Sequence, residues 1–444
     1  MNDYMVAITI ISFLLTIGFI FWRPHVNEAI PSTIGAILVI LSGSVSLFDL
    51  IKITDTISGA AITIMATIVM AIVLESFGFF YWAAEILTRQ ARGSGYRMFW
   101  FTNLFCFLMT LFVNNDGSIL ITTPILLMLL RNMGLRNSQQ IPYLLSGALI
   151  ATASSAPIGV SNIVNLIALK IVNMDLYMQT AMMFVPASLG LLMLALLLYY
   201  TFYPAIPKKL PAISSWHLMP GSHPLKSPQQ EKRRSSKYMG YILVFVIVVR
   251  LSLFAASFLH IPISLMAVIG SALLLMWRWY HLKISPADML KRTPWSIFLF
   301  AFSMYVIIYG LDKIGLTEVL IAFMEPLITD SMLHASVLTG GLLSILSNLF
   351  NNHPALMVGT ITLTGMELDP LTLKLAYLAG VIGSDVGSLL LPIGTLATLM
   401  WMHMIRKGGV KFSWGQYLKV TIFVIPITVI FTLVALSYWV MWLF

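Results

Sequence analysis

Apolar stretches of about 20 residues follow one another along nearly the whole chain, and they limit the possible folds more than any other feature. A helix of this length crosses the hydrocarbon core of a bilayer. A membrane barrel would instead alternate apolar and polar residues along shorter strands, and these stretches do not alternate. Only 10% of the 444 residues are charged, against roughly 25% in a soluble domain. The sequence therefore predicts an all-α polytopic membrane protein.

Charge, cysteine content and motifs exclude several other classes of protein. The net charge of +9 does not indicate nucleic-acid binding, because Lys and Arg fall in the loops between apolar stretches. The single cysteine, Cys106, cannot form an intramolecular disulfide or a multi-thiolate site, and we expect it to pack as a small apolar residue. The sequence contains no zinc-peptidase, serine-hydrolase or P-loop motif. We therefore expect a membrane protein that is not an enzyme and has no metal site and no cofactor.

The basic loops predict a re-entrant hairpin in the first half of the chain. Arginines cluster in the loops at 89–97 and 131–136, so both loops should face the cytoplasm. The apolar arms between them are too short for two full spans and meet at the polar tip 114–116, Asn-Asn-Asp. We therefore predict that residues 98–130 enter the membrane from the cytoplasm and return. Such a tip is tolerated at mid-membrane only where protein or a cavity surrounds it.

The remaining apolar stretches give about ten transmembrane helices and two hairpins, with both termini outside the cell. The N-terminal stretch has no Lys or Arg before it, so we expect a retained span rather than a cleaved signal peptide. The long hydrophilic segment 204–237 is rich in Pro, Ser and basic residues, and we predict a cytoplasmic linker there. The predicted spans are 5–22, 27–47, 57–87, 141–170, 180–203, 238–258, 260–280, 294–322, 371–404 and 418–443.

Two polar motifs recur in the same order in the two halves of the chain. LFVNNDGSILI at 111–121 matches NLFNNHPALMVG at 348–359, and a Pro-Ile-Gly follows each, at 157–159 and 392–394. We expect the recurrence to reflect an internal repeat rather than chance.

The repeat divides the chain into residues 1–203 and 238–444, on either side of the linker. Each half holds five predicted spans, an odd number, so the second half should lie upside down relative to the first. Inverted-topology repeats of this kind are typical of secondary transporters. The second hairpin, 334–366, should then enter from outside.

The inverted repeat should bring two hairpin tips and two broken helices together near the middle of the membrane. Pro157 and Gly159, like Pro392 and Gly394, interrupt a helix, and the break frees backbone groups for a solute. For any one polar side chain here, the alternative role is hydrogen bonding between helices. The predicted substrate-binding residues are Asn114, Asn115, Ser161, Asn162 and Asn165 from the first half, and Asn351, Asn352, Ser384, Thr395 and Thr398 from the second.

Charged residues inside the membrane are the candidates for proton coupling. A buried acid costs about 2.5–3.5 kcal/mol on insertion scales, so it is a functional candidate by default. Asp116 and Asp385 lie inside the repeated motifs, and His353 occupies the second tip. The alternative for Asp116 is capping of the second hairpin arm. Glu75 is a weaker candidate, and Arg250 is expected near a span end.

At these residues the chain resembles the arsenical pump membrane protein family (ArsB) of the ion transporter superfamily. The resemblance lies in NNDGSILITTPI, SNIVN, PWSIFLFAFSMYVIIYGLDKIGLTE, NNHPALMVG and VIGSDVGSLLLPIGTLATLMWMH, and it covers most of the chain outside 204–237. It implies the ion transporter superfamily fold and export of arsenite or antimonite across a bacterial plasma membrane, driven by inward proton movement. It also implies a homodimer with a scaffold and a moving domain and, in some members, an ATPase subunit.

The chain departs from the family pattern at four places. The family often has an acid at the position of Thr152, a lysine at that of Leu389, and NNMP where this chain reads NNHP, and Asp312-Lys313 differs from the usual pair. The missing acid and base leave the coupling and the substrate open. A pocket of amides and hydroxyls suits arsenite, which is an uncharged trihydroxide at neutral pH. Two carboxylates near broken helices also suit a cation, so sodium/proton antiport is one alternative. Transport of another small anion or metabolite is the other.

Overall fold

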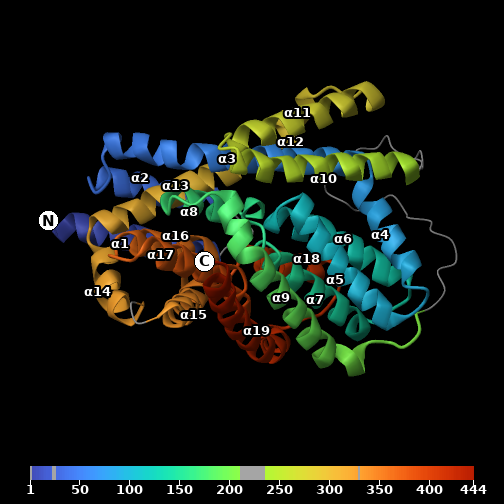
Figure 1. The fold of residues 1–444 in the computed structure, drawn as a ribbon. Coiled ribbons are helices and arrows are strands. Elements are labelled where there is room, and N and C mark those ends of the chain that lie inside the picture. The colour runs from blue at the N-terminus through green and yellow to red at the C-terminus, as the bar shows by residue number, and fades with distance from the viewer. Residues whose placement is uncertain (1–2, 23–26, 211–235, 329–330) are drawn as a thin grey trace.

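The computed structural model describes residues 3–22, 27–210, 236–328 and 331–444. Within these ranges the chain is helical and contains no strand, which confirms the all-α membrane architecture (Figure 1). The first half holds α1 (Asp3–Trp22), α2 (Ala29–Leu41), α3 (Leu47–Ser76), α4 (Phe79–Gln90), α5 (Gly95–Phe112), α6 (Asn115–Asn132), α7 (Asn137–Ala153), η1 (Gly159–Ser161), α8 (Ile163–Ile171), α9 (Leu176–Phe202) and η2 (Tyr203–Ala205).

Apart from η2 in the first half and α12 in the second, the second half repeats this order of elements. It holds α10 (Ser236–Phe258), α11 (Ile263–Leu282), α12 (Ala287–Arg292), α13 (Ser296–Lys313), α14 (Leu316–Ile328), α15 (Met332–Phe350), α16 (Asn352–Thr364), α17 (Pro370–Asp385), η3 (Gly387–Leu390), α18 (Leu396–Lys407) and α19 (Trp414–Leu443). The predicted linker falls mostly on residues 211–235, which lie outside the described residues.

The described residues contain nine helices that are long and apolar enough to cross a membrane. One of them, α15, is the first arm of the predicted second hairpin. The predicted span 27–47 is the shorter helix α2. The predicted spans 141–170 and 371–404 are each interrupted, at the two Pro-Ile-Gly sequences where we expect breaks.

Two further interruptions correct the predicted spans 57–87 and 294–322. The helix at the first of these spans, α3, begins ten residues earlier than predicted, after Ser46, which caps it through a reciprocal capping box, and it ends at Ser76. Gly78 then turns the chain into α4 with a φ of 79°, and Gly315 separates α13 from α14 with a φ of 87°. Glycine adopts such left-handed backbone without a Cβ clash. Gly78 and Gly315 each stand 36 residues before the first Asn of a hairpin tip, so these turns are a further feature that both halves share.

The helices of the two halves pack against each other reciprocally. α2 contacts α13, while the corresponding pair, α11 and α3, also contact each other. In the same way α6 contacts α18 and α16 contacts α8, and α9 packs along α19. Each half therefore completes the packing of the other, as two related units would around a pseudo-two-fold axis.

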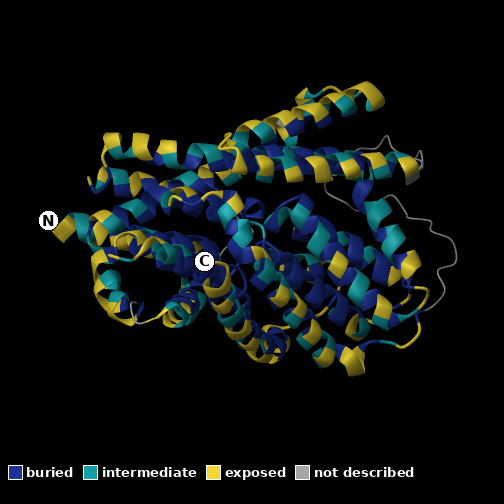
Figure 2. Ribbon diagram, viewed as in Figure 1, coloured by how far each residue is buried: buried dark blue, intermediate teal, exposed yellow. Residues whose placement is uncertain are grey.

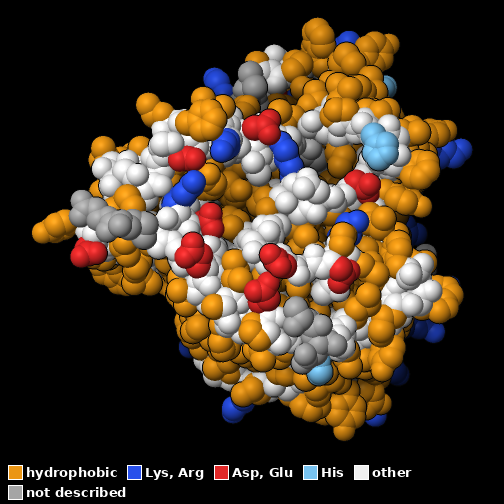
Figure 3. All heavy atoms as spheres, turned by 60° about the vertical axis from the view of Figure 1, so that its left-hand side comes forward, with side chains coloured by type: hydrophobic (Ala, Val, Ile, Leu, Met, Phe, Trp, Pro, Cys, Tyr) orange, Lys and Arg blue, Asp and Glu red, His pale blue; other side chains and the backbone are white. Residues whose placement is uncertain are grey.

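Burial separates the lipid-facing helices from the interior. α1, α10 and α11 show exposed residues along their length, whereas α7 and α17 are almost wholly buried (Figure 2). The exposed residues of α10 include the apolar Val244, Val248 and Leu251, as expected of a surface that meets acyl chains. From the left-hand side of Figure 1, several Asp and Glu side chains are visible across the middle of one face (Figure 3).

Candidate functional site

The break in the first half lies between α7 and α8. Pro157 lacks a backbone donor and lies in the turns that follow Ala153, so the helix does not continue. The chain resumes as a helix at Ile163, where the Asn162 side chain accepts a hydrogen bond of 3.0 Å from the Val164 N–H. The segment between the two helices is short and buried, and it carries Ser155, Ser161 and Asn162.

The break in the second half is held in shape by its neighbours. Asn348 of α15 donates to the Gly387 carbonyl at 2.8 Å and accepts from the Leu391 N–H at 2.7 Å. The hydroxyl of Tyr417 donates to the Leu389 carbonyl at 2.8 Å. A Cβ at Gly394 would overlap the Ser388 carbonyl, so only glycine fits there. This loop is therefore a fixed structure.

Asp385, the last residue of α17, connects the two breaks. Its carboxylate accepts hydrogen bonds from the Ser155 hydroxyl at 2.8 Å, from the Asn165 amide at 2.9 Å and from the Asn162 amide at 3.1 Å. All three donors belong to the first half, and the exposed fraction of Asp385 is 0%. Tyr377 lies about two helical turns before Asp385 on α17. Its hydroxyl donates to the Asn165 carbonyl at 3.0 Å. A buried carboxylate of one half is thus bound by three donors from the other.

The two Asn-Asn motifs, at the tips of the predicted hairpins, fall between α5 and α6 and between α15 and α16. Asn114 caps α6 by accepting from the Gly117 N–H at 2.8 Å. The cap of α6 is therefore Asn114, which disfavours the capping role considered for Asp116. In the second tip, the Asn351 side chain accepts from the His353 N–H at 3.4 Å, and the Asn352 N–H donates to the Gly394 carbonyl at 2.9 Å.

Several buried polar atoms near the tips and breaks make no hydrogen bond within the part of the chain that the structure describes. Buried polar groups are normally paired, so such a group of unpaired atoms indicates a place where a polar solute or water binds. These atoms are both amide atoms of Asn115, the Ser161 hydroxyl, Asn165 Oδ1, Asn351 Nδ2, Asn352 Oδ1, His353 Nδ1 and the Ser388 hydroxyl.

Other predicted binding residues are occupied within the protein. The Thr395 hydroxyl caps α18 by accepting from the Thr398 N–H at 3.0 Å and donates to the Thr398 hydroxyl at 2.8 Å. Ser384 donates to the Val381 carbonyl of its own helix at 3.2 Å. We therefore expect these three residues to shape the site, while the unpaired amides contact the solute.

Glu28 is a site residue that the sequence did not single out. It directly precedes α2 and lies within electrostatic range of both Asp116 and His353. A small apolar cluster explains this approach, because Ala29 packs with Phe300, whose ring centroid is 5.9 Å from that of His353. Glu28 precedes a predicted span in an unremarkable sequence, so only the tertiary structure brings it to the tips.

Arg250 differs from its prediction. It lies within α10 rather than near a span end, and it is buried. Its guanidinium reaches the carbonyl groups that precede the first tip, Phe112 and Val113.

Thr152 and Leu389, two of the positions that depart from the family pattern, are fully buried in this structure. The Thr152 hydroxyl donates to the Ala148 carbonyl of its own helix at 3.1 Å. Leu389 packs in the core, and its carbonyl is the one that Tyr417 binds. Asp385 is thus not accompanied by a second acid or a lysine at either position.

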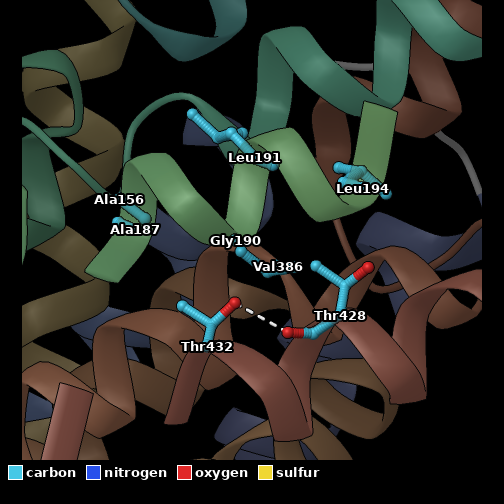
Figure 4. A pocket seen from close by; sticks show the side chains of 9 residues that line it. Ala156, Ala187, Gly190, Leu191, Leu194, Val386, Thr428 and Thr432 are labelled. Atoms are coloured by element: carbon cyan, nitrogen blue, oxygen red, sulfur yellow. Dashed lines mark hydrogen bonds between the residues drawn. The ribbon is translucent and has the colours of Figure 1, made fainter. Parts of the chain in front are cut away.

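A small pocket between α9 and α19 borders both breaks but does not resemble a binding site (Figure 4). Its walls are mainly small and aliphatic, with Ala156 from one break and Val386 from the other. The only hydroxyls in its wall, those of Thr428 and Thr432, donate to carbonyls of their own helix. The polar group around Asp385 and the tips is therefore the candidate site.

Comparisons with known proteins agree on one family. The sequence model of the family described as "Arsenical pump membrane protein", ArsB, matches residues 7–440. The chain is 57% identical over 446 residues to a Bacillus subtilis (strain 168) protein named "Putative arsenical pump membrane protein", covering 98% of this chain and 100% of that one. It is 29% identical over 428 residues to the Escherichia coli "Arsenical pump membrane protein", covering 96% and 97% of the two chains.

A solved structure with a similar fold is the YdaH transporter of Alcanivorax borkumensis, described as having an unusual topology. The TM-score is 0.57 at 13% sequence identity, and the match covers 90% of each chain. At this identity the likeness concerns the fold alone.

Proposed function

We propose that this chain, which belongs to the arsenical pump membrane protein family, exports arsenite and antimonite from the cytoplasm in exchange for protons. Membership of the family identifies an arsenical efflux transporter in a membrane. The identity of the transported species and the exchange with protons are the parts that we propose. The observation that carries the proposal is the buried Asp385 carboxylate, bound by three donors from the opposite half.

Protonation of Asp385 would change its contacts with the first half. An ionised carboxylate only accepts hydrogen bonds, whereas a protonated one also donates. The Ser155 hydroxyl can rotate to accept, and Asn165 can turn its unpaired Oδ1 toward the proton. Asn162 cannot turn, because its own oxygen caps α8. One proton on Asp385 therefore rearranges a junction between the two halves, which is what coupling to a conformational change requires.

The unpaired polar atoms suit a neutral trihydroxide. Each hydroxyl of arsenite both donates and accepts, and the amides of Asn115, Asn165 and Asn352 offer atoms of both kinds. Cys106 is the only cysteine and is fully buried, so capture by three thiolates plays no part. Weak polar binding allows rapid release, as transport demands.

The tips provide a second set of ionisable groups. Asp116 and His353 both lie within electrostatic range of Glu28. We propose that these three side chains carry the proton between the site and water, while Asp385 couples it to the movement. An orientation with both termini outside, in a bacterial plasma membrane, places the basic loops in the cytoplasm. An ATPase subunit and a homodimer are further elements of the proposal that rest on the family.

Sodium/proton antiport is the second candidate, and one observation favours it. The Asp385 carboxylate, the Ser155 hydroxyl that binds it and the unpaired Oδ1 of Asn165 are oxygen ligands of the kind that a hard cation prefers. A sodium ion bound there would neutralise the carboxylate as a proton does.

Uptake into everted membrane vesicles tests the proposal. Vesicles with an acidic interior should accumulate labelled arsenite only when they contain this protein, and labelled sodium and citrate serve as the competing substrates. Accumulation of sodium without arsenite would replace the proposal with cation antiport. Accumulation of none of the three would overturn both candidates.

A further inference from the structure

Arg250 is a cation in the interior of an apolar helix. It stands within VFVIVVRLSLF, residues 244–254 of α10, and its exposed fraction is 8%. Among the described residues no carboxylate forms an ion pair with it. A charged side chain at such a position costs about 2.5–3.5 kcal/mol on insertion scales, so its presence calls for a function.

The guanidinium binds the end of the first hairpin arm. Its Nη2 donates to the Phe112 carbonyl at 2.9 Å and to the Val113 carbonyl at 3.2 Å. These carbonyls belong to the last turn of α5, where a helix has unpaired acceptors and a partial negative charge. The next residue is Asn114, so Arg250 fixes the backbone directly before the tip.

The remaining donors of Arg250 are buried and unused. Nε and Nη1 have no hydrogen-bond partner among the described residues. The guanidinium has five N–H donors in a rigid plane, so the same side chain can bind a second set of acceptors without leaving its place. It can therefore remain bound to this arm when the arm shifts.

We propose that Arg250 is a positioning residue for transport, which holds the tip of the first hairpin in its binding geometry from the opposite half of the chain. The inference rests on the proposed function for its role in transport. The contact itself links α10 to α5, and it predicts how freely the tip opens whether or not arsenite is the substrate.

A purely structural role makes a different prediction. Buried charged groups can often be replaced by apolar side chains of similar volume without loss of stability. If Arg250 only filled space, Arg250→Met would keep both a closed tip and normal transport. If it positions the tip, Arg250→Met should fold but leave the tip loose.

Thiol labelling measures the tip directly. In a Cys106→Ser background, Val113→Cys places one thiol at the held residue, which is buried in the structure. A water-soluble maleimide should label this thiol slowly when Arg250 is present. With Arg250→Met we expect labelling at least about tenfold faster, the scale of losing one hydrogen bond to a charged group. Leu251→Met, on the exposed side of the same helix, is the matched control and should leave the rate unchanged.

Transport kinetics supply the second readout. Arg250→Met should raise the KM for arsenite more than it lowers the maximal rate, and Arg250→Lys should restore part of the affinity because it keeps the charge. If Arg250→Met does not yield folded protein, Arg250→Gln replaces it with the same expectations. Unchanged labelling in the folded variant overturns the role of Arg250, whereas lack of arsenite transport by the unsubstituted protein overturns the proposed function instead.

Discussion

The two hairpin tips occupy equivalent places in the repeat but are held in different ways. In the first, Asn114 has extended backbone with a φ of −175°, and Arg250 of the other half binds the arm before it. In the second, Asn351 has a φ of 78°, which is unfavourable for a residue with a Cβ, and Asn352 bonds to Gly394 of its own half. The backbone before the first tip is thus bound by a charged side chain of the other half. The second tip has a strained backbone that a hydrogen bond within its own half stabilises.

The two helix breaks also differ, in the chemical groups that they supply. The first supplies neutral donors, and the second supplies the carboxylate that they bind. The two halves therefore share the order of their helices, while the ionisable group and its hydrogen-bond donors lie in different halves. A transporter with this arrangement can respond to one proton on Asp385, because the hydrogen bonds that the proton changes join the two halves.

The largest effect on transport is expected from replacing Asp385, and it should exceed the effect of replacing Asp116. Asp385→Asn should lower pH-driven arsenite accumulation by about a hundredfold or more, as expected when a buried network loses its charge. Asp116→Asn should lower it less, since Asp116 is only half-buried and Asn114 caps its helix. Arsenite accumulation in everted vesicles measures both, at matched protein levels. Equal losses in the two variants would contradict the division of roles.

Two glycines of the breaks should differ in their tolerance of a methyl group. At Gly394 a Cβ overlaps a backbone carbonyl, whereas at Gly159 it meets only the amide end of Gln179. That amide makes no hydrogen bond in the protein and can move aside. We expect Gly394→Ala to lower the free energy of unfolding by about 1–3 kcal/mol and Gly159→Ala by less. Thermal unfolding in detergent gives the order, and a larger loss for Gly159→Ala would show that the first break is the more rigid.

The backbones of the tips make a prediction of opposite sign. Asn351→Gly should relieve left-handed strain of about 1–3 kcal/mol and so raise the melting temperature slightly. Asn114→Gly should lower it, because an extended residue gains nothing from glycine and the cap of α6 is lost. A destabilised Asn351→Gly would mean that its side chain, not its backbone, holds the second tip.

The smallest effect is expected at Cys106. Counted from the tips, Cys106 in α5 and Leu343 in α15 are equivalent, and both pack against a glycine of the following broken helix. A Cβ at Gly147 would lie 2.9 Å from the Cys106 sulfur, and one at Gly380 would lie 2.6 Å from Leu343 Cδ1. The thiol thus stands where the other half has an aliphatic side chain. Cys106→Ser should keep transport within about twofold, since the change costs only packing, and a large loss would indicate direct participation of the thiol.

Most of the fold follows from the sequence, because apolar length and the repeated Asn-Asn and Pro-Ile-Gly motifs are local signals. The glycine turns at Gly78 and Gly315 were missed, because apolar residues continue across both and hide the change of direction. In the site, Asp385 and the tip asparagines were named from the motifs. The Asp385 partner Ser155 was not, nor were Glu28 and the role of Arg250, because each meets the site only through contacts between residues far apart in the sequence.

The most direct test of the account is proton movement driven by arsenite alone. Purified protein in proteoliposomes, with arsenite on one side, equal pH on both sides and a pH-sensitive dye inside, should show proton movement opposite to the arsenite flux. Asp385→Asn should abolish the dye signal, and labelled-arsenite binding should persist because the solute is neutral. Downhill arsenite movement by the unsubstituted protein with no change in internal pH would contradict proton exchange and the role assigned to Asp385.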